Sequence, residues 1–322
     1  MRAVEYKGLR TLSLVEAMRA PLVPAGWVRV RVRACGLCGS DISKWIKAEP
    51  RPGYLKTRIL GHEVVGEVTE CGANVSRLRP GMRVAVEPLF VCGECAACVS
   101  GCSEFCVGLK ALGRDLPGGF SEEIFAPEKF VWALKKNISD DVGTLLDPLA
   151  VVVHGFDLAS LSLNGLKVAV IGDGPLGLLS VAYAKNHGAQ QVVLLGRHAV
   201  RLAAGKELGA DEAVNTVAGY RLPQDRRNQF GLVIEAVGGS QSATLELGIS
   251  CTAPSGTLLV FGVFEAGFCA QLPARDLFFR EIRVIGVNSF ARSAERSDFG
   301  TALDFLEKEF GALSRLITHR LT

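Results

Sequence analysis

The stretch from Lys167 to Gly177 constrains the fold of this chain more than any other part of the sequence. Its first half, Val168 to Ile171, is a short apolar run rich in β-branched residues, which is typical of a buried parallel strand. Glycines at Gly-x-Gly-x-x-Gly spacing follow, and a helical pattern begins there. Such a turn lets the backbone approach a pyrophosphate, whose charge the helix start favours. A purely structural turn is the alternative, and the flanking strand and helix favour a dinucleotide site. The expected cofactor contacts in the turn are Gly172, Gly174, Pro175, Leu176 and Gly177.

From Leu166 onward, strand and helix patterns alternate. Strands are predicted at 167–172, 191–196, 212–216, 232–238, 257–263 and 283–289. Helices are predicted at 175–188, 198–209 and 241–252. Strand–helix alternation of this kind indicates a parallel sheet that is covered on both faces. The six strands agree with an α/β, doubly wound dinucleotide-binding (Rossmann) fold.

The region from residue 1 to about 90 has a different pattern. Short strands are expected at 27–33, 64–69 and 83–86, with Pro- and Gly-containing turns between them. In Trp27 to Arg33 valine alternates with arginine or tryptophan, which indicates a half-exposed strand. Many short strands of this kind predict a β-rich, barrel-like or sandwich domain. Near the other end, Arg292 to Phe310 is expected to form one amphipathic helix.

Composition excludes several classes of protein. The 322 residues suggest two domains, and a net charge of +3 gives no reason to expect nucleic acid as a partner. We find neither a signal peptide nor an apolar run of membrane-spanning length, so we expect a cytoplasmic protein with no membrane partner. Most of the ten cysteines are clustered at metal-ligand spacing, which favours thiolate and metal chemistry over disulfides.

One cysteine cluster is the strongest local signal in the chain. It has the spacing Cys-x2-Cys-x2-Cys-x7-Cys and consists of Cys92, Cys95, Cys98 and Cys106. Four thiolates can close a tetrahedral zinc site and leave no position for a substrate, so this zinc should be structural. Cys102 lies in the same loop and is expected to be a bystander rather than an alternative ligand.

A second group of metal-ligand residues is scattered along the first half of the chain. Cys38, His62, Glu63 and Asp147 supply the sulfur, nitrogen and oxygen ligands that zinc accepts. They lie too far apart for a local finger, so only the fold could assemble them. Taken singly, Cys38 could be a buried thiol and His62 a core residue, and Asp147 could be a carboxylate at a helix start.

The end of the second predicted strand bears on the choice of cofactor. NAD-binding sheets usually carry an acidic residue there, which holds the ribose 2′-hydroxyl. Here Gly196 stands at that position, and Arg197, His198 and Arg201 follow it. A guanidinium group can bind a 2′-phosphate, so the sequence predicts NADP(H) in preference to NAD(H). The alternative is that these residues are solvated side chains at a helix start.

Taken together and in this order, these motifs resemble the zinc-dependent medium-chain alcohol dehydrogenase family, in particular its polyol, sorbitol and threonine dehydrogenase branch. The motifs are Cys38-Gly-Ser-Asp41, Gly61-His-Glu63, the four-cysteine lobe, Asp147-Pro-Leu149 and the glycine turn. The resemblance implies a catalytic domain at 1–150, with a zinc lobe at about 90–108, and a dinucleotide-binding domain at 151–290. A segment at 291–322 should return to the catalytic domain; because relatives continue for a few dozen residues beyond it, we expect it to be truncated.

The resemblance also implies roles for individual residues. Cys38 and His62 would ligate a catalytic zinc, with Glu63 or Asp147 as the third protein ligand. Ser40 matches the hydroxyl of the proton relay, and Asp41 matches a residue that orients a zinc-bound histidine. Many relatives carry a histidine at the position of Ser43, so the relay beyond Ser40 stays open.

The resulting expectation is a zinc-dependent oxidoreductase with two zinc ions per chain, one catalytic and one structural. It would transfer a hydride between NADP(H) and a secondary alcohol or polyol-like substrate, such as a sugar, cyclitol or amino-sugar alcohol, and its ketone. The family also implies a homodimer or homotetramer. The alternatives are an NAD-dependent sorbitol- or threonine-like dehydrogenase and a non-catalytic binding protein of the same superfamily.

Overall fold

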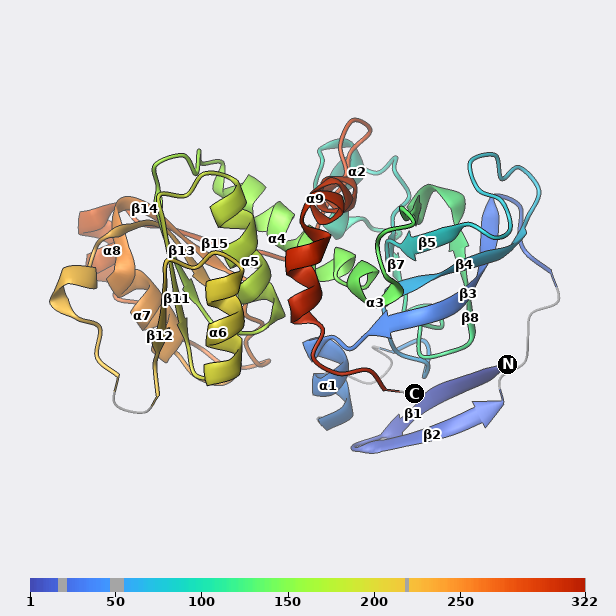
Figure 1. Cartoon of the computed structure of the whole chain (residues 1–322), viewed down its shortest axis with the longest axis horizontal. Coiled ribbons are helices and arrows are strands. Elements are labelled where there is room, and N and C mark those ends of the chain that lie inside the picture. The colour runs from blue at the N-terminus through green and yellow to red at the C-terminus, as the bar shows by residue number, and fades with distance from the viewer. Residues whose placement is uncertain (17–21, 47–54, 218–219, 322) are drawn as a thin grey trace. The chain divides into compact units, whose positions relative to one another are not determined.

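The computed structural model describes residues 1–16, 22–46, 55–217 and 220–321. The chain folds as two compact units (Figure 1). The first unit consists of Met1–Asp147 and Ala291–Phe310, and the second of Pro148–Phe290 and Gly311–Thr322. The first unit is therefore assembled from two separate parts of the sequence.

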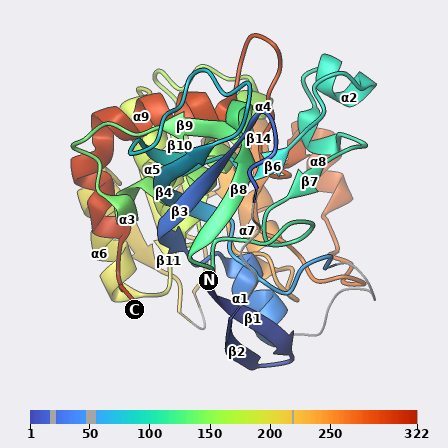
Figure 2. The ribbon, with the colours of Figure 1, turned by 90° about the vertical axis from the view of Figure 1, so that its right-hand side faces the viewer.

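A five-stranded antiparallel sheet is the frame of the first unit. Across the sheet, its strands are β8 (Glu123–Pro127), β3 (Trp27–Gly36), β4 (Glu63–Cys71), β5 (Arg83–Val86) and β9 (Val131–Ala133). Figure 2 shows strands β3, β4 and β8 of this unit from another side. The pairing of β3 with β4 shifts register twice, and such bulges bend a sheet and increase its twist. Val30, Val64, Val84 and Ile124 belong to the buried apolar cluster of this unit. The expectation of a β-rich first domain is confirmed, and its antiparallel sheet is curled.

Strand β3 differs in one respect from the half-exposed strand that its alternating sequence predicts. The side chain of Arg29 is only 2% exposed. Its guanidinium group lies 3.0 Å from a carboxylate oxygen of Glu70 on β4 and 3.2 Å from one of Glu123 on β8, and it covers the ring of Phe125. Because both neighbouring strands supply an acidic partner, the arginine can be buried at this position.

Smaller elements surround this sheet. They are the hairpin of β1 (Arg2–Gly8) and β2 (Thr11–Glu16), and the helices α1 (Gly39–Ile46) and α3 (Asp140–Gly143). The cysteine lobe contains only β6 (Leu89–Phe90), α2 (Ala96–Val99), the 3-10 helix η1 (Ser103–Phe105) and β7 (Lys110–Ala111). With so little regular structure, the lobe depends on its cysteines for a fixed shape.

The second unit contains a six-stranded parallel sheet (Figure 1). Its strand order is β12 (Glu212–Asn215), β11 (Gln191–Gly196), β10 (Lys167–Ile171), β13 (Phe230–Glu235), β14 (Thr252–Val260) and β15 (Arg283–Gly286). The connecting helices are α5 (Pro175–Asn186), α6 (Ala199–Glu207), α7 (Ala243–Cys251) and α8 (Ala274–Arg280). The chain winds outward from β10 in both directions, so this is the predicted doubly wound Rossmann sheet.

Two helices differ from the expectation. The C-terminal helix α9 (Asp298–Leu313) begins at Asp298 and not at Arg292. Arg292 and Ser297 instead form an isolated antiparallel bridge, and the Asp298 carboxylate accepts a hydrogen bond from the N–H of Ala291 at 2.8 Å. Helix α8 was not predicted, because it is short and exposes Phe278 and Phe279 rather than presenting a regular apolar face.

The expectation that no apolar run reaches membrane-spanning length is wrong. The helical stretch Asp140–Ala159, which includes α4 (Leu146–Ala159), passes that test of length and composition. However, 83% of its most apolar window is buried inside the fold. Burial of this extent is what the core helix of a folded domain shows, so the run is weak evidence for a membrane span.

Candidate active site

The register of β3 against β4 brings two distant motifs together. Gly36, the last residue of β3, pairs with Glu63, the first residue of β4. Cys38 therefore follows the end of one strand where His62 precedes the start of its neighbour. The side chain of Glu63 passes over Gly36, since a Cβ at Gly36 would lie 1.9 Å from a Glu63 carboxylate oxygen. Any larger residue at Gly36 would have to displace the Glu63 carboxylate.

This register produces a cluster of metal-ligand atoms. One ligand atom each of Cys38, His62 and Glu63 lies within 4.8 Å of the others. Asp147, the second residue of α4, is not a member of this group. Burial and then the charge of Asp147 raise the pKa of Glu63 well above its ordinary value. Burial raises the pKa of Asp147 to about 6, and His62 opposes this shift. The charge of Asp147 therefore acts on Glu63, although Asp147 does not belong to the same group of ligand atoms.

Asp41 lies beside His62. Its carboxylate is 2% exposed, with Oδ2 at 3.6 Å from Nδ1 of His62 and Oδ1 at 3.8 Å from Nζ of Lys44. Neither oxygen has a hydrogen-bond partner among the residues that the structure describes. Since Nδ1 of His62 faces Asp41, Nε2 is the ring nitrogen left for another partner. At 3.6 Å the two groups are beyond hydrogen-bond distance, but the carboxylate lies on the side of the ring from which such groups orient a histidine ligand.

The residues at this site fit a zinc ion. The thiol, imidazole and carboxylate are a set that zinc binds. The acidic side chains of Asp41, Glu63 and Asp147 are all buried here, so a bound cation would neutralise charge that few other groups offset. Ser40 is exposed, and its backbone nitrogen is 3.5 Å from Sγ of Cys38. The residue predicted to take part in proton relay is thus next to a candidate ligand and exposed.

The four predicted cysteines of the lobe also converge. The sulfur atoms of Cys92, Cys95, Cys98 and Cys106 all lie within 4.8 Å of one another. Sγ of Cys92 is 3.9 Å from Sγ of Cys98 and 3.5 Å from that of Cys106, so these thiols are not disulfide-bonded. A zinc with sulfur ligands at about 2.3 Å requires sulfur–sulfur edges of about 3.8 Å, which these distances approach.

The lobe cysteines differ in how readily they form thiolates: burial raises the pKa of Cys98 to about 12. Backbone N–H groups of Cys98 and Val107 lower the pKa of the Cys95 thiol to about 6. Cys102 is exposed and lies outside the four-sulfur group. The donor set and its geometry therefore fit a structural zinc held by four cysteines.

The glycine turn lies where the sequence predicts it, between β10 and α5. Gly174 precedes the helix, and a Cβ there would meet nothing within 4 Å, so a ligand can approach its backbone. A Cβ at Gly177 would lie 1.9 Å from the carbonyl oxygen of Gly172, which is why the helix packs closely on the turn. Pro175 is the first residue of α5, where its missing N–H costs no helix bond. The turn fits the pyrophosphate of a dinucleotide.

Strand β11 ends beside this turn, at Gly196. Arg197, His198 and Arg201 follow it and are exposed. Sequence reasoning missed Asp173, the residue between the first two glycines, which is 6% exposed and bonded to the backbone of Arg197 and His198. The signal that could have found it is an acidic residue inside a turn that should bind phosphates.

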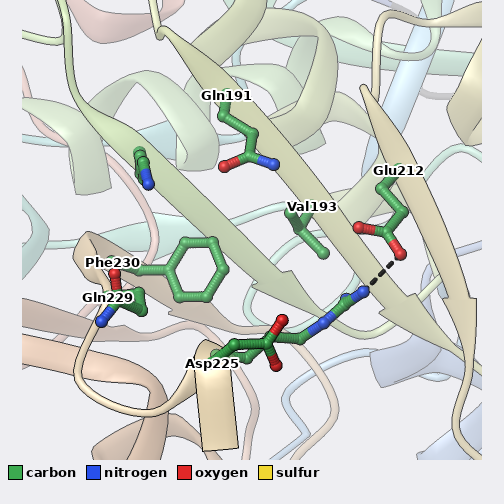
Figure 3. A pocket seen from close by; sticks show the side chains of 8 residues that line it. Gln191, Val193, Glu212, Asp225, Gln229 and Phe230 are labelled. Atoms are coloured by element: carbon green, nitrogen blue, oxygen red, sulfur yellow. Dashed lines mark hydrogen bonds and ion pairs between the residues drawn. The ribbon is translucent and has the colours of Figure 1, made fainter. Parts of the chain in front are cut away.

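A cavity of about 140 Å³ lies elsewhere in the second unit (Figure 3). Its lining includes Lys167, Gln191, Glu212 and Phe230, which are the first residues of β10, β11, β12 and β13. The cavity is thus at the amino edge of the parallel sheet, whereas ligands of such sheets bind at the carboxyl edge. It is separate from the glycine turn.

The comparisons with known proteins agree with this geometry. Residues 24–136 match the model of the alcohol dehydrogenase GroES-like domain, and residues 175–308 match that of the zinc-binding dehydrogenase. A D-altritol 5-dehydrogenase of Agrobacterium fabrum is 32% identical over 100% of this chain and 92% of its own length.

Two solved structures extend the comparison. A protein described as a zinc-binding dehydrogenase from Sinorhizobium meliloti, bound to NADP, has a TM-score of 0.84 and 29% identity, with 97% of this chain and 89% of that chain covered. A protein described as a short chain alcohol dehydrogenase from Escherichia coli, in complex with NADH, has a TM-score of 0.85 and 27% identity, with 99% of this chain and 91% of that chain covered.

The chain belongs to the zinc-dependent medium-chain alcohol dehydrogenase family. It is an oxidoreductase that acts on CH–OH groups of a small-molecule alcohol and uses zinc and a nicotinamide cofactor.

Proposed function

We propose that this enzyme transfers a hydride between NADP(H) and the secondary alcohol of a polyol-like substrate, forming or consuming the ketone. The convergence of Cys38, His62 and Glu63 into one cluster of ligand atoms is the observation that carries the proposal. A sugar, cyclitol or amino-sugar alcohol is the substrate class, and the D-altritol 5-dehydrogenase relative supports it.

The catalytic residues have separate tasks in this proposal. Cys38, His62 and Glu63 hold the catalytic zinc, with Asp147 as the alternative to Glu63. When bound, zinc polarises the substrate oxygen and lowers the pKa of the alcohol. Asp41 keeps the imidazole of His62 in place from the Nδ1 side. Ser40 accepts the proton that leaves the substrate and passes it to solvent, to which its side chain is open.

A second zinc is proposed in the lobe, held by Cys92, Cys95, Cys98 and Cys106. It stabilises the lobe and has no contact with the substrate, since all four positions are filled by protein. The expected content is thus about two zinc ions per chain, of which the lobe ion survives loss of a catalytic ligand.

The preference for NADP(H) is supported at the end of β11. Gly196 brings no carboxylate that would repel a 2′-phosphate. The guanidinium groups of Arg197 and Arg201 are exposed, and neither has an ion-pair or hydrogen-bond partner among the described side chains. Charge-assisted bonds from such groups favour NADP(H) by roughly ten- to hundredfold. One solved relative carries NADP and another NADH, so the fold accepts either cofactor.

We further propose a cytoplasmic homodimer or homotetramer. Strand β15 is at one end of the parallel sheet and pairs with β14 on one side. Its residue Val284 is exposed, as are Phe278 and Phe279 on the preceding helix. An edge strand with apolar neighbours is a surface that a second copy can cover. Sedimentation at micromolar concentration should show a dimer or tetramer; a monomer would contradict this part of the proposal.

A substrate panel tests the central proposal. Rates are measured for polyols, amino polyols and simple secondary alcohols with NADP and with NAD, beside metal analysis of the same preparation. Turnover of a polyol with NADP at a higher kcat/KM than with NAD supports the proposal. A higher kcat/KM with NAD would indicate the sorbitol- or threonine-like alternative. A protein that retains only the lobe zinc and oxidises none of these alcohols would indicate the non-catalytic alternative.

A further inference from the structure

The side chain of Asp173 joins the glycine turn to the end of the neighbouring strand. Strands β10 and β11 pair directly, with Ile171 opposite Leu195, so the turn after one lies beside the end of the other. Oδ2 of Asp173 accepts hydrogen bonds from the backbone N–H of Arg197 at 2.8 Å and of His198 at 2.6 Å. Nδ1 of His198 lies 3.0 Å from Oδ1. One carboxylate thus holds three groups of the β11–α6 connection.

Asp173 is held in its ionised form although it is 6% exposed. Burial is the largest influence on its pKa and would raise it. The hydrogen bonds from the His198 ring and from the backbone of His198 and Arg197 together outweigh burial, so the pKa is lowered. The Asp173 carboxylate is therefore negatively charged, and its hydrogen-bond donors are the backbone of Arg197 and His198 and the His198 ring.

The Asp173 side chain lies against Gly196, the last residue of β11. A Cβ at Gly196 would lie 2.6 Å from Cβ of Asp173 and 2.7 Å from its Oδ2. The space into which a side chain at the end of the second strand would extend is already filled by Asp173. The end of β11 therefore still has a carboxylate beside it, but this carboxylate belongs to Asp173 of the glycine turn. Its oxygens accept hydrogen bonds from Arg197 and His198, so they do not point toward a ribose.

We infer that Asp173 is a positioning residue for the adenosine end of the cofactor, which acts through Arg197 and His198. It fixes the backbone from which Arg197 extends, and it binds Nδ1 of His198 so that Nε2 is the ring nitrogen available to a ligand. The His198 side chain is 57% exposed, and when both ring nitrogens are protonated its Nε2–H can donate to an anion such as a 2′-phosphate. This inference rests on the proposed preference for NADP(H).

The experiment compares Asp173→Ala and Asp173→Asn with the wild-type enzyme. Dissociation constants are measured for NADPH and NADH by the fluorescence of the reduced nicotinamide, and for 2′,5′-ADP and 5′-AMP by calorimetry. The two nucleotides probe the adenosine end alone and require no turnover. In Asp173→Ala, Arg197 and His198 are no longer held in position. Kd for NADPH and for 2′,5′-ADP should therefore rise by about tenfold or more. NADH and 5′-AMP should change by less than about threefold, because the glycine turn still binds their phosphates.

Asp211 provides a matched control in the same unit. Its carboxylate accepts a backbone hydrogen bond from Val192 at 2.7 Å and pairs with Lys185, but it lies at the amino end of β11, the other edge of the sheet. Asp211→Ala should lower Tm and leave the NADPH-to-NADH ratio of Kd unchanged. Asp173→Asn keeps an oxygen acceptor for the backbone and should restore part of the lost NADPH affinity.

An unchanged Kd ratio in Asp173→Ala, or tighter NADPH binding, would overturn the inference; the second result would mean that the carboxylate merely repels the phosphate. The wild-type ratio tests the proposed cofactor preference separately. A wild-type enzyme that binds NADH more tightly would contradict that preference, while the change of ratio on replacing Asp173 would still decide the positioning role.

Discussion

The indole Nε1 of Trp132 donates a hydrogen bond to Oε2 of Glu87 over 3.0 Å. Glu87 is 1% exposed, and Nη1 of Arg292 lies 3.2 Å from the same oxygen. Burial raises the pKa of Glu87 from 4.5 to about 7, although Arg292 and Trp132 oppose the shift. The charge of Asp298 adds to the rise. The first unit therefore contains a carboxyl group that takes up its proton near neutral pH.

This carboxyl group should make stability depend on pH. The folded state binds the proton more tightly than the unfolded state, so its contribution is complete below pH 4.5 and is lost as the pH rises through about 7. At about 1.4 kcal/mol per pH unit, the loss is on the order of 3 kcal/mol. Urea unfolding of the wild type and Glu87→Gln at pH 5 and pH 8 measures it. The wild type should lose more stability than the variant, because glutamine does not titrate.

A surface carboxylate supplies the comparison for this experiment. Glu122 pairs with Arg2, and its pKa is lowered rather than raised. Glu122→Gln should therefore leave the decline between pH 5 and pH 8 as it is in the wild type. If the Glu87→Gln and wild-type curves ran parallel, the buried carboxyl group would not be the cause.

Loss of a lobe cysteine should damage stability more than chemistry. The unfolded chain has no preformed zinc site, so the free energy of zinc binding contributes to folding. Cys95→Ser should lose about one zinc ion per chain and show a lower Tm, and the wild type treated with chelator should behave similarly. Cys102→Ser, in the same loop but outside the four-sulfur group, should keep both its zinc content and its Tm. A Tm that is unaffected by removal of the lobe zinc would be incompatible with a structural role.

Loss of a catalytic zinc ligand should damage turnover more than stability. Cys38→Ser and His62→Ala should each lower kcat by roughly a thousandfold or more, since the metal supplies several kcal/mol of transition-state stabilisation. Cofactor affinity should remain, because the glycine turn belongs to a sheet with its own core. Cys71→Ser, which changes a thiol elsewhere in the first unit, should leave kcat unchanged. Equal loss of cofactor binding in Cys38→Ser and His62→Ala would contradict the assignment.

The close approach of Gly196 and Asp173 predicts a coupling between them. Gly196→Ala brings a Cβ to 2.6 Å from Cβ of Asp173 and should destabilise the protein by about 1–3 kcal/mol. Asp173→Gly removes the obstructing atoms, so the double variant should recover part of that loss, with a coupling of about 1–2 kcal/mol. Thermal unfolding of the wild type, Gly196→Ala, Asp173→Gly and the double variant measures this coupling. Additive changes would show that the two side chains do not compete for one space.

Local patterns of sequence were sufficient for much of the fold. The six parallel strands and the glycine turn follow from apolar runs and breaker residues that are close in the sequence. Element boundaries were less predictable. Helix α9 begins at Asp298 because a backbone bridge and the Asp298 carboxylate close the turn before it, and Arg29 is buried because two other strands supply its partners. Neither cause is visible in the residues of the element itself.

The sequence by itself determined which side chains could take part in metal and phosphate chemistry. The spacing of the four lobe cysteines and of the three glycines is local, and a short loop or turn brings such residues together whatever the rest of the chain does. The tertiary structure decided which of the distant candidates meet. Pairing of Gly36 with Glu63 brings Cys38 to His62 and Glu63 while Asp147 remains outside their group. Pairing of β10 with β11 brings the side chain of Asp173 into contact with Gly196. Strand register is set by packing over the whole sheet, so no local pattern specifies these contacts.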